Sequence, residues 1–241
     1  MSPKWTKRPR VAVLDNLKQT EMKSIKFQGE TITLRKTVNQ LLRIHKVAKP
    51  VNDNWYLQAN HLCREIAKEA SFSAQSPSSR IMEAIFGIRV EPIRVAGIIA
   101  ALSPQKSWPE NIRLAEDFIL KGSRKGHTGV MIGKAKAIWA LPNHELTPET
   151  IVEILNGPKI SSFFLNIYQP YQSQAVTIDR HAVDAAMGKV LENKTMTVNQ
   201  YRFFELAYQT AAVKIGIKGS ELQAIVWEEW RAQKGLVNET F

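Results

Sequence analysis

Apolar residues recur at helical spacing along most of the chain. Between residues 37 and 49, Val38, Leu41 and Leu42 belong to one apolar face, and Pro50 ends the stretch. The same spacing, with prolines at starts and glycines at ends, predicts further helices over 55–70, 79–86, 91–102, 108–121, 132–140, 148–155, 160–168, 180–191, 197–214 and 219–233. We therefore predict an all-α protein of short helices.

Strand-like alternation is nearly absent, and its one instance lies near the beginning. Residues 31–34, Thr-Ile-Thr-Leu, follow a turn residue, Gly29, and predict a small hairpin or an irregular strap. Asp53 or Asn54 is predicted to cap the helix over 55–70. Residues 71–79 are small and polar, which predicts a loop and the best candidate for a mobile connection.

Positive charge is concentrated at the start of the sequence. The chain has a formal net charge of +11, and residues 1–50 contribute +9 of it, from twelve Lys or Arg against three acidic residues. We divide the chain into a basic N-terminal extension with the first helix, 1–50, and a helical domain, 51–241. A focused positive field suits the phosphates of DNA, whereas a solubilising tail or a patch for another acidic partner, such as a membrane surface, is the alternative.

Composition limits the class of protein. Of the 241 residues, 44% are hydrophobic and 23% are charged, which is typical of a soluble globular protein. No stretch approaches the ~20 apolar residues that span a bilayer, and the N-terminus does not resemble a secretory signal. The single cysteine, Cys63, excludes an internal disulfide and any cysteine-based zinc or iron–sulfur site. We expect a cytoplasmic monomer that binds DNA, not membranes, and needs no cofactor or metal.

The turn around Gly157 is the strongest local signal. Apolar helical faces precede and follow it, and residues 156–159 read Asn-Gly-Pro-Lys. The helix that starts there presents free backbone N–H groups, and with Lys159 these suit a phosphate. We therefore place Asn156, Gly157 and Lys159 in a candidate DNA contact; the alternative is an ordinary corner between packed helices.

Asp179 is the candidate catalytic carboxylate. It follows the apolar residues 176–178 and precedes a helix, so that it can cap the helix N-terminus. A partly buried carboxylate in that position can also face a substrate on which positive charge develops. The next two residues, Arg180 and His181, are candidates to bind a flanking phosphate, although a histidine in a first helical turn is often only packed or solvated.

Four motifs then occur in a recognisable order. Residues 101–105 read Ala-Leu-Ser-Pro-Gln, residues 134–138 read Lys-Ala-Lys-Ala-Ile, residues 157–166 hold the Gly-Pro-Lys turn with Phe-Phe-Leu-Asn, and residues 176–181 read Val-Thr-Ile-Asp-Arg-His. This order resembles the helix–hairpin–helix (HhH-GPD) superfamily of DNA glycosylases, particularly its endonuclease III branch. The resemblance covers roughly residues 90–192. The hairpin has one glycine where the family usually has two, and the four-cysteine cluster of that branch is missing.

The resemblance implies a multi-helix glycosylase-like fold and specific roles. Asp179 would stabilise the oxocarbenium-like sugar of a flipped nucleotide while its glycosidic bond breaks. Lys159 would either attack the sugar C1′ as the free amine of a bifunctional glycosylase and lyase, or serve only as a phosphate contact. Gln105 would fill the gap that the flipped base leaves in the duplex.

Loop residues next to Gln105 add to the expected DNA contact. Trp108, with Lys106 beside it, is the tryptophan that we expect to touch DNA. Trp227 and Trp230 stand three residues apart among apolar neighbours, and we expect both in the core.

Three other functions remain open on the sequence. Glycosylase-like proteins of bacteriophages have been assigned to thymidine hypermodification, in which an amine displaces a phosphorylated group from hydroxymethyluracil in DNA, and this chain resembles them in size and in lacking the cysteine cluster. A non-catalytic DNA-binding module on the same scaffold is the second. A basic helical interaction protein, for instance an inhibitor of a nucleic-acid enzyme, is the third.

Overall fold

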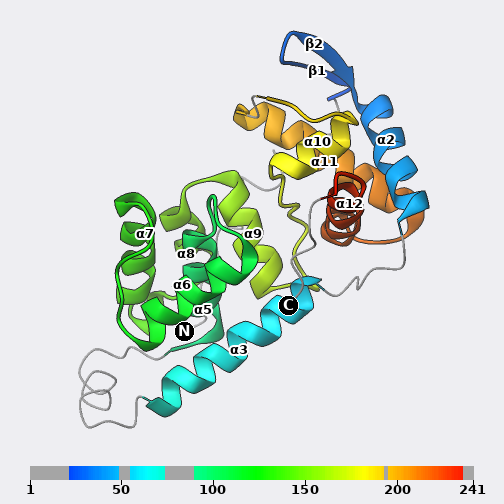
Figure 1. Ribbon diagram of the computed structural model, residues 1–241. Coiled ribbons are helices and arrows are strands. Elements are labelled where there is room, and N and C mark those ends of the chain that lie inside the picture. The colour runs from blue at the N-terminus through cyan, green and yellow to red at the C-terminus, as the bar shows by residue number, and fades with distance from the viewer. Residues whose placement is uncertain (1–21, 49–54, 74–89, 193–194, 236–241) are drawn as a thin grey trace, which may run out of the picture.

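The computed structural model describes residues 22–48, 55–73, 90–192 and 195–235, which form ten α-helices, one 3-10 helix and one two-stranded hairpin (Figure 1). The predicted all-α class is confirmed for this part of the chain. The elements are β1 (Ser24–Phe27), β2 (Glu30–Thr33), α2 (Leu34–Val47), α3 (Trp55–Ser73), α5 (Pro92–Leu102), α6 (Trp108–Leu120), α7 (Gly129–Ala140), η1 (Asn143–Glu145), α8 (Pro148–Leu155), α9 (Pro158–Tyr168), α10 (Arg180–Met187), α11 (Val198–Ile215) and α12 (Gly219–Gln233).

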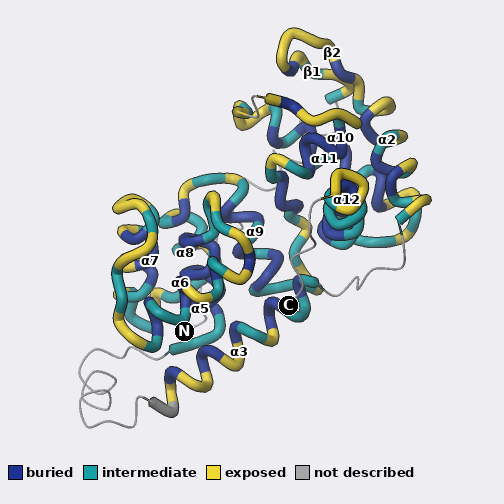
Figure 2. The backbone as a smooth tube through the Cα atoms, viewed as in Figure 1, coloured by how far each residue is buried: buried dark blue, intermediate teal, exposed yellow. Residues whose placement is uncertain are grey.

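Helices α3 and α5–α9 form a first lobe around α5. Ten of the eleven residues of α5 are buried, because every residue except Arg94 is apolar and other helices surround it (Figure 2). Gly97 permits a close approach: a Cβ at this position would lie 3.1 Å from Cγ2 of Ile151 in α8 and 3.2 Å from Cγ2 of Ile138 in α7. Helices α8 and α9 thus both pack against this buried central helix.

The hairpin and helices α2, α10, α11 and α12 form a second lobe with its own core. β1 and β2 pair antiparallel, with Ile25 opposite Ile32, which confirms the predicted hairpin. Phe27 of the hairpin packs edge-on against Phe204 of α11, with ring centroids 5.3 Å apart. Helix α2 lies in this lobe, so the described part of the basic N-terminal stretch packs against helices from the C-terminal end of the chain (Figure 1).

An extended segment, residues 173–179, connects the two lobes (Figure 1). Several of its backbone groups form hydrogen bonds with side chains of α11 instead of with a neighbouring strand. The hydroxyl of Tyr201 donates to the carbonyl of Val176 (2.8 Å) and accepts from the amide of Ile178 (3.1 Å), and Oε1 of Glu205 accepts from the amide of Val176 (3.0 Å). These bonds fix the backbone that leads directly into Asp179.

Several helix boundaries differ from the predicted ones, each for a local reason. Helix α2 begins at Leu34 rather than 37, because the hydroxyl of Thr33 caps it by accepting from the amide of Lys36. Helix α10 ends at Met187 rather than 191, where Gly188 takes a left-handed φ of 70°. Helix α3 continues through Ser73 into the predicted loop 71–79.

Other predictions concern residues outside the described ranges. These are the helix over 79–86, the cap at Asp53 or Asn54 and the later part of the loop 71–79. Among the helices of the described ranges, none is both long and apolar enough to cross a lipid bilayer.

Candidate functional site

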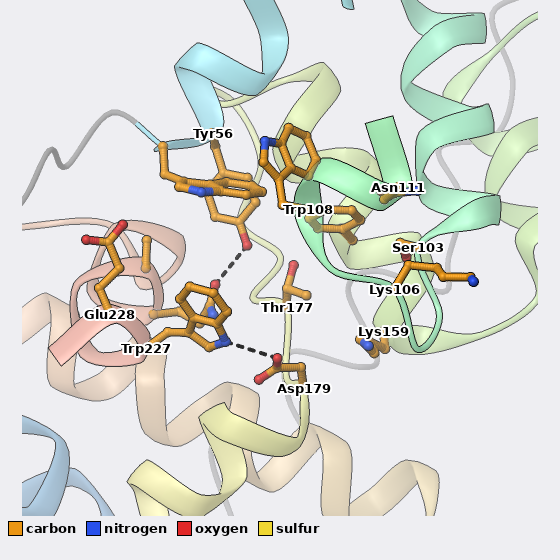
Figure 3. A pocket seen from close by; sticks show the side chains of 14 residues that line it. Tyr56, Ser103, Lys106, Trp108, Asn111, Lys159, Thr177, Asp179, Trp227 and Glu228 are labelled. Atoms are coloured by element: carbon orange, nitrogen blue, oxygen red, sulfur yellow. Dashed lines mark hydrogen bonds between the residues drawn. The ribbon is translucent and has the colours of Figure 1, made fainter. Parts of the chain in front are cut away.

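A pocket of about 130 Å³ lies between the two lobes (Figure 3). Its walls come from α3, α6, α9, α12, the turn after α5 and the connecting segment. Lys159 and Asp179, which the sequence singled out independently, both line it. We call this space the inter-lobe pocket.

Asp179 enters the pocket from the N-terminus of α10. Its Oδ1 accepts a hydrogen bond from the amide of Ala182 (2.7 Å), which is the predicted helix cap. Its Oδ2 accepts from the indole Nε1 of Trp227 (3.1 Å), drawn as a dashed line in Figure 3. Both oxygens are therefore oriented by donors, while the residue stays partly exposed. This arrangement holds a carboxylate in a fixed position beside the pocket.

Lys159 reaches the pocket from the first turn of α9. Asn156 ends α8 with a left-handed φ of 42°, Gly157 is extended, and Pro158 starts α9 two residues before the predicted position. The ammonium of Lys134 in α7 donates to the carbonyl of Leu155 at the end of α8, which ties the turn to the first lobe. Within the described residues, Lys159 forms no ion pair or hydrogen bond, so its ammonium is available to a ligand.

The turn itself lies outside the pocket lining. Asn156 is exposed and Gly157 is half-buried, and neither borders the inter-lobe pocket. The N–H groups at the start of α9 have no partners one turn earlier in the helix, as at any helix N-terminus. Asn156 and Gly157, the predicted phosphate contacts, thus do not line the pocket themselves, but Lys159, two residues after Gly157, does.

Aromatic side chains form much of the pocket wall. The ring centroid of Trp55 lies 4.8 Å from that of Trp108 and 6.0 Å from that of Phe163, and Tyr56 stands edge-on to Trp55 at 5.0 Å. Trp108 is the first residue of α6, lines the pocket and is only 8% exposed. Flat apolar walls of this kind suit a planar ring.

The turn after α5 adds a cation to one side of the pocket. Lys106 lines the pocket and pairs with Glu110 of α6 at 2.6 Å. Gln105 precedes it with a left-handed φ of 61°, and its exposed side chain does not line the pocket. A non-glycine residue in this conformation is unusual, and here it forms the tip of a turn next to a pocket-lining residue.

Arg180 and His181 follow Asp179 but lie outside the pocket lining. Arg180 is exposed, and its Nε donates to Nε2 of His181 at 3.3 Å. Burial lowers the pKa of His181, whose ring stands edge-on to Trp227 with centroids 6.2 Å apart. His181 therefore packs against the indole that holds Asp179, while Arg180 is exposed to solvent, where it can meet an anion.

Helix α12 supplies pocket residues that the sequence analysis missed. Trp227 was predicted to lie in the core with Trp230, and this is wrong for Trp227, which lines the pocket, and correct for Trp230, which is 4% exposed. Gln223 and Glu228 also line the pocket, and burial raises the pKa of Glu228. In Figure 3, Trp227 and Glu228 lie on the side opposite Lys106 and Lys159. No local signal marks these positions, because they belong to the site only through the packing of α12.

Residues 79–234 match the family of unknown function DUF7178, and the chain therefore belongs to that family. The matched region contains α5–α12 and thus every pocket residue except those of α3. No curated protein and no solved structure matches the chain.

Proposed function

We propose that this protein binds DNA, accepts one flipped nucleotide in the inter-lobe pocket and breaks its glycosidic bond with the help of Asp179. The observation that carries the proposal is that Lys159 and Asp179 line one pocket whose walls are aromatic. A base stacks on such walls, a lysine neutralises a phosphate, and a fixed carboxylate stabilises positive charge on a sugar. The order of the four sequence motifs supports the same function by resemblance.

In the proposed reaction, the bond between C1′ of the sugar and the base nitrogen breaks, and its electron pair leaves with the base. The sugar develops oxocarbenium character, which the Asp179 carboxylate stabilises from its position between Ala182 and Trp227. Water adds to C1′ and gives up a proton, the base gains one, and an abasic site remains. If the unprotonated amine of Lys159 attacks C1′ instead, a C–N bond forms as the base leaves and the nitrogen gives up a proton. Opening of the C1′–O4′ bond of the sugar then gives the Schiff base that leads to strand cleavage.

The test is incubation of the full chain with duplexes that each carry one damaged or modified base. We expect release of a base from at least one duplex by the wild type and a loss of at least about 100-fold in rate for Asp179→Asn, which keeps the side-chain size but removes the charge. Normal turnover by Asp179→Asn contradicts the proposed role.

Borohydride trapping then distinguishes the two nucleophiles. A covalent adduct that disappears in Lys159→Arg assigns the amine of Lys159 as nucleophile, and Lys136→Arg, at an exposed position of α7, is the matched control. Product formation without any trapped adduct shows that water is the nucleophile.

A second candidate is an amine transferase that acts on phosphorylated hydroxymethyluracil in DNA. The observation in its favour is a second pocket carboxylate, Glu228, whose raised pKa suits it to accept the proton that an attacking amine gives up as its C–N bond forms. In that reaction the amine nitrogen bonds to the methylene carbon of the base, and the phosphate leaves with the electron pair. Mass spectrometry separates the candidates, because the transferase leaves the glycosidic bond intact and adds the mass of the amine.

A further inference from the structure

A groove of about 460 Å³ lies on the second lobe, apart from the inter-lobe pocket. Its walls come from β2, α2 and the end of α10, which lie together in this lobe (Figure 1). Along α2 the lining residues stand at positions 35, 36, 39, 40 and 43, which is the spacing of one helical face. We call this space the α2 groove.

The lining of the α2 groove is strongly basic. Four cations line it against one carboxylate, Glu30, and leave a net charge of +3; the cations are Arg35, Lys36, Arg43 and Lys189. All four are exposed. Glu30 pairs with Lys189 at 2.7 Å, and its pKa is lowered by Lys189 and, to a smaller extent, by Lys36. The carboxylate of the groove is thus already matched, and the three cations of α2 need an anion from elsewhere.

The cations of α2 form a row instead of a cluster. Arg35 and Arg43 are eight positions apart in one helix, which is about 12 Å along its axis. The same length of a B-DNA strand holds about three to four nucleotides. A single phosphate ion is bound by donors that converge on one point, whereas a row of cations suits a row of phosphates. A concave wall also fits a strand better than the flat surface of a membrane.

Packing between α2 and α10 positions one of these cations. Gly188 ends α10 with a φ of 70°, and a Cβ at this position would lie 3.0 Å from both Cδ and Nε2 of Gln40. The amide of Gln40 therefore lies close to the backbone of Gly188, and its Oε1 accepts from Nη1 of Arg43 at 3.2 Å. Because a guanidinium has five N–H donors, this bond orients Arg43 and leaves other donors for phosphate oxygens.

Two of the cations lie where a helix favours negative charge. Arg35 and Lys36 belong to the first turn of α2, which has no acidic residue. The N-terminal end of a helix carries partial positive charge, so cations there are unfavourable in the absence of an anion. A bound phosphate would reverse the sign of this interaction, which gives a physical reason for a ligand at this end of the groove.

We infer that the α2 groove binds the phosphate backbone of DNA through Arg35, Lys36 and Arg43. The groove and the inter-lobe pocket lie toward opposite ends of α10, since Asp179 caps this helix and Met187 is its last residue. Eight helical residues span about 12 Å, well within the roughly 34 Å of one duplex turn, so one duplex is long enough to contact both. The inference rests on the proposed function only for the choice of DNA as the polyanion.

The test is binding of the full chain to a fluorescein-labelled, unmodified duplex of about two helical turns, followed by anisotropy over a range of salt concentrations. The groove variant combines Arg35→Gln, Lys36→Gln and Arg43→Gln. Each phosphate contact contributes about 0.9 to the slope of log K against log salt concentration. We therefore expect the slope to shrink by about 2–3 and the affinity to fall by at least about tenfold. An unchanged slope and affinity overturn the inference.

A second triple variant separates the groove from the general charge of the lobe. It combines Lys23→Gln, Lys26→Gln and Lys46→Gln, which remove the same charge from exposed positions of the same lobe that do not line the groove. This control should keep the affinity within about threefold and the slope within about 1 of the wild-type values. Equal losses in the two triple variants overturn the assignment to the groove.

A single variant guards against failure of the groove variant to fold. Lys36→Glu places an acidic residue in the first turn of α2, which favours the helix, but it reverses a charge in the groove. It should weaken binding to the duplex by at least about threefold. Unchanged binding by Lys36→Glu contradicts the inference.

Two further comparisons separate this inference from its rivals. Vesicles of equal parts phosphatidylcholine and phosphatidylserine are the probe for a lipid surface; if the groove variant loses vesicle binding but keeps DNA binding, the choice of DNA is overturned. DNA binding that depends on the groove, without base release from the duplex panel, rejects the proposed reaction and leaves the inference standing. Base release with a DNA affinity that is the same in the groove variant does the reverse.

Discussion

The indole of Trp227 donates a hydrogen bond to Oδ2 of Asp179 at 3.1 Å, across 48 positions of sequence. The other carboxylate oxygen is held by the amide of Ala182, at the start of the helix that Asp179 caps. Local structure therefore orients one oxygen, and the packing of α12 orients the other. A group held at both oxygens does not need to reorganise when charge develops beside it.

Replacing Trp227 by Phe tests the second of these bonds. The ring still fills its part of the wall, but Asp179 loses one of two donors, and we expect the rate of base release to fall by about 10- to 100-fold, as for loss of a hydrogen bond to a charged group. Trp230→Phe is the matched control, because Trp230 lies in the core of the second lobe at 4% exposure. It should lower stability and leave the rate constant unchanged; equal rate losses in both variants contradict the specific role of Trp227.

The stability of Asp179 variants should follow the number of donors left without an acceptor. An Asn side chain has only one acceptor oxygen, so it can accept from the amide of Ala182 or from the indole of Trp227 but not from both. Asp179→Asn should therefore cost about 1 kcal/mol of unfolding free energy. Asp179→Ala removes the cap and both bonds and should cost about 2–3 kcal/mol. Urea denaturation measures both, and an Ala variant as stable as the wild type shows that these bonds do not stabilise the fold.

Arg94 should be essential for the stability of the first lobe. Its guanidinium is fully buried and donates to the carbonyls of Ile138 (2.7 Å), Trp139 (2.8 Å) and Leu141 (2.8 Å), at the end of α7. Burial lowers its pKa to about 10. Arg94→Met leaves these carbonyls unsatisfied, and we expect a loss of about 3–5 kcal/mol by urea denaturation. A loss below about 1 kcal/mol indicates that water replaces the guanidinium.

Glu205 should make the wild type less stable as the pH rises. Burial raises the pKa of Glu205 above its ordinary value of 4.5, so the folded state binds its proton more tightly than the unfolded state. The favourable contribution of Glu205 to the unfolding free energy is complete below its pKa in the unfolded state. It is lost as the pH rises through its pKa in the folded state. Glu205→Gln keeps an oxygen that can accept from the amide of Val176 but carries no charge.

Unfolding free energies of the wild type and Glu205→Gln, measured from about pH 4 to about pH 8, test this. We expect Glu205→Gln to gain stability relative to the wild type toward the upper end of the range. Glu153→Gln, at an exposed position of α8, is the control and should follow the wild type. A constant difference between Glu205→Gln and the wild type at every pH contradicts the role assigned to burial.

Local signals in the sequence predicted the helices of the described ranges and four of the pocket residues, Lys106, Trp108, Lys159 and Asp179. Thr147 caps α8, Pro148 starts it, and the turn that follows α8 ends at Pro158. Such boundaries can be predicted from the sequence because a cap, a proline or a left-handed residue affects only the few residues next to it. The same locality makes Asp179 a predictable cap and Lys159 a predictable residue of a helix N-terminus. DNA binding and bond breaking remain predictions.

The partners across the pocket depend on contacts that are far apart in the sequence. Tyr56 meets Gln223 across 167 positions, and α2 joins the helices of the second lobe although it belongs to the basic N-terminal stretch. A helical face shows by its pattern that it will be buried, but not against which other face, because apolar burial is non-directional. The sequence by itself thus determined the helices, their caps and the two chemical groups, while the tertiary structure decided that Trp227, Gln223 and Asn111 would surround them.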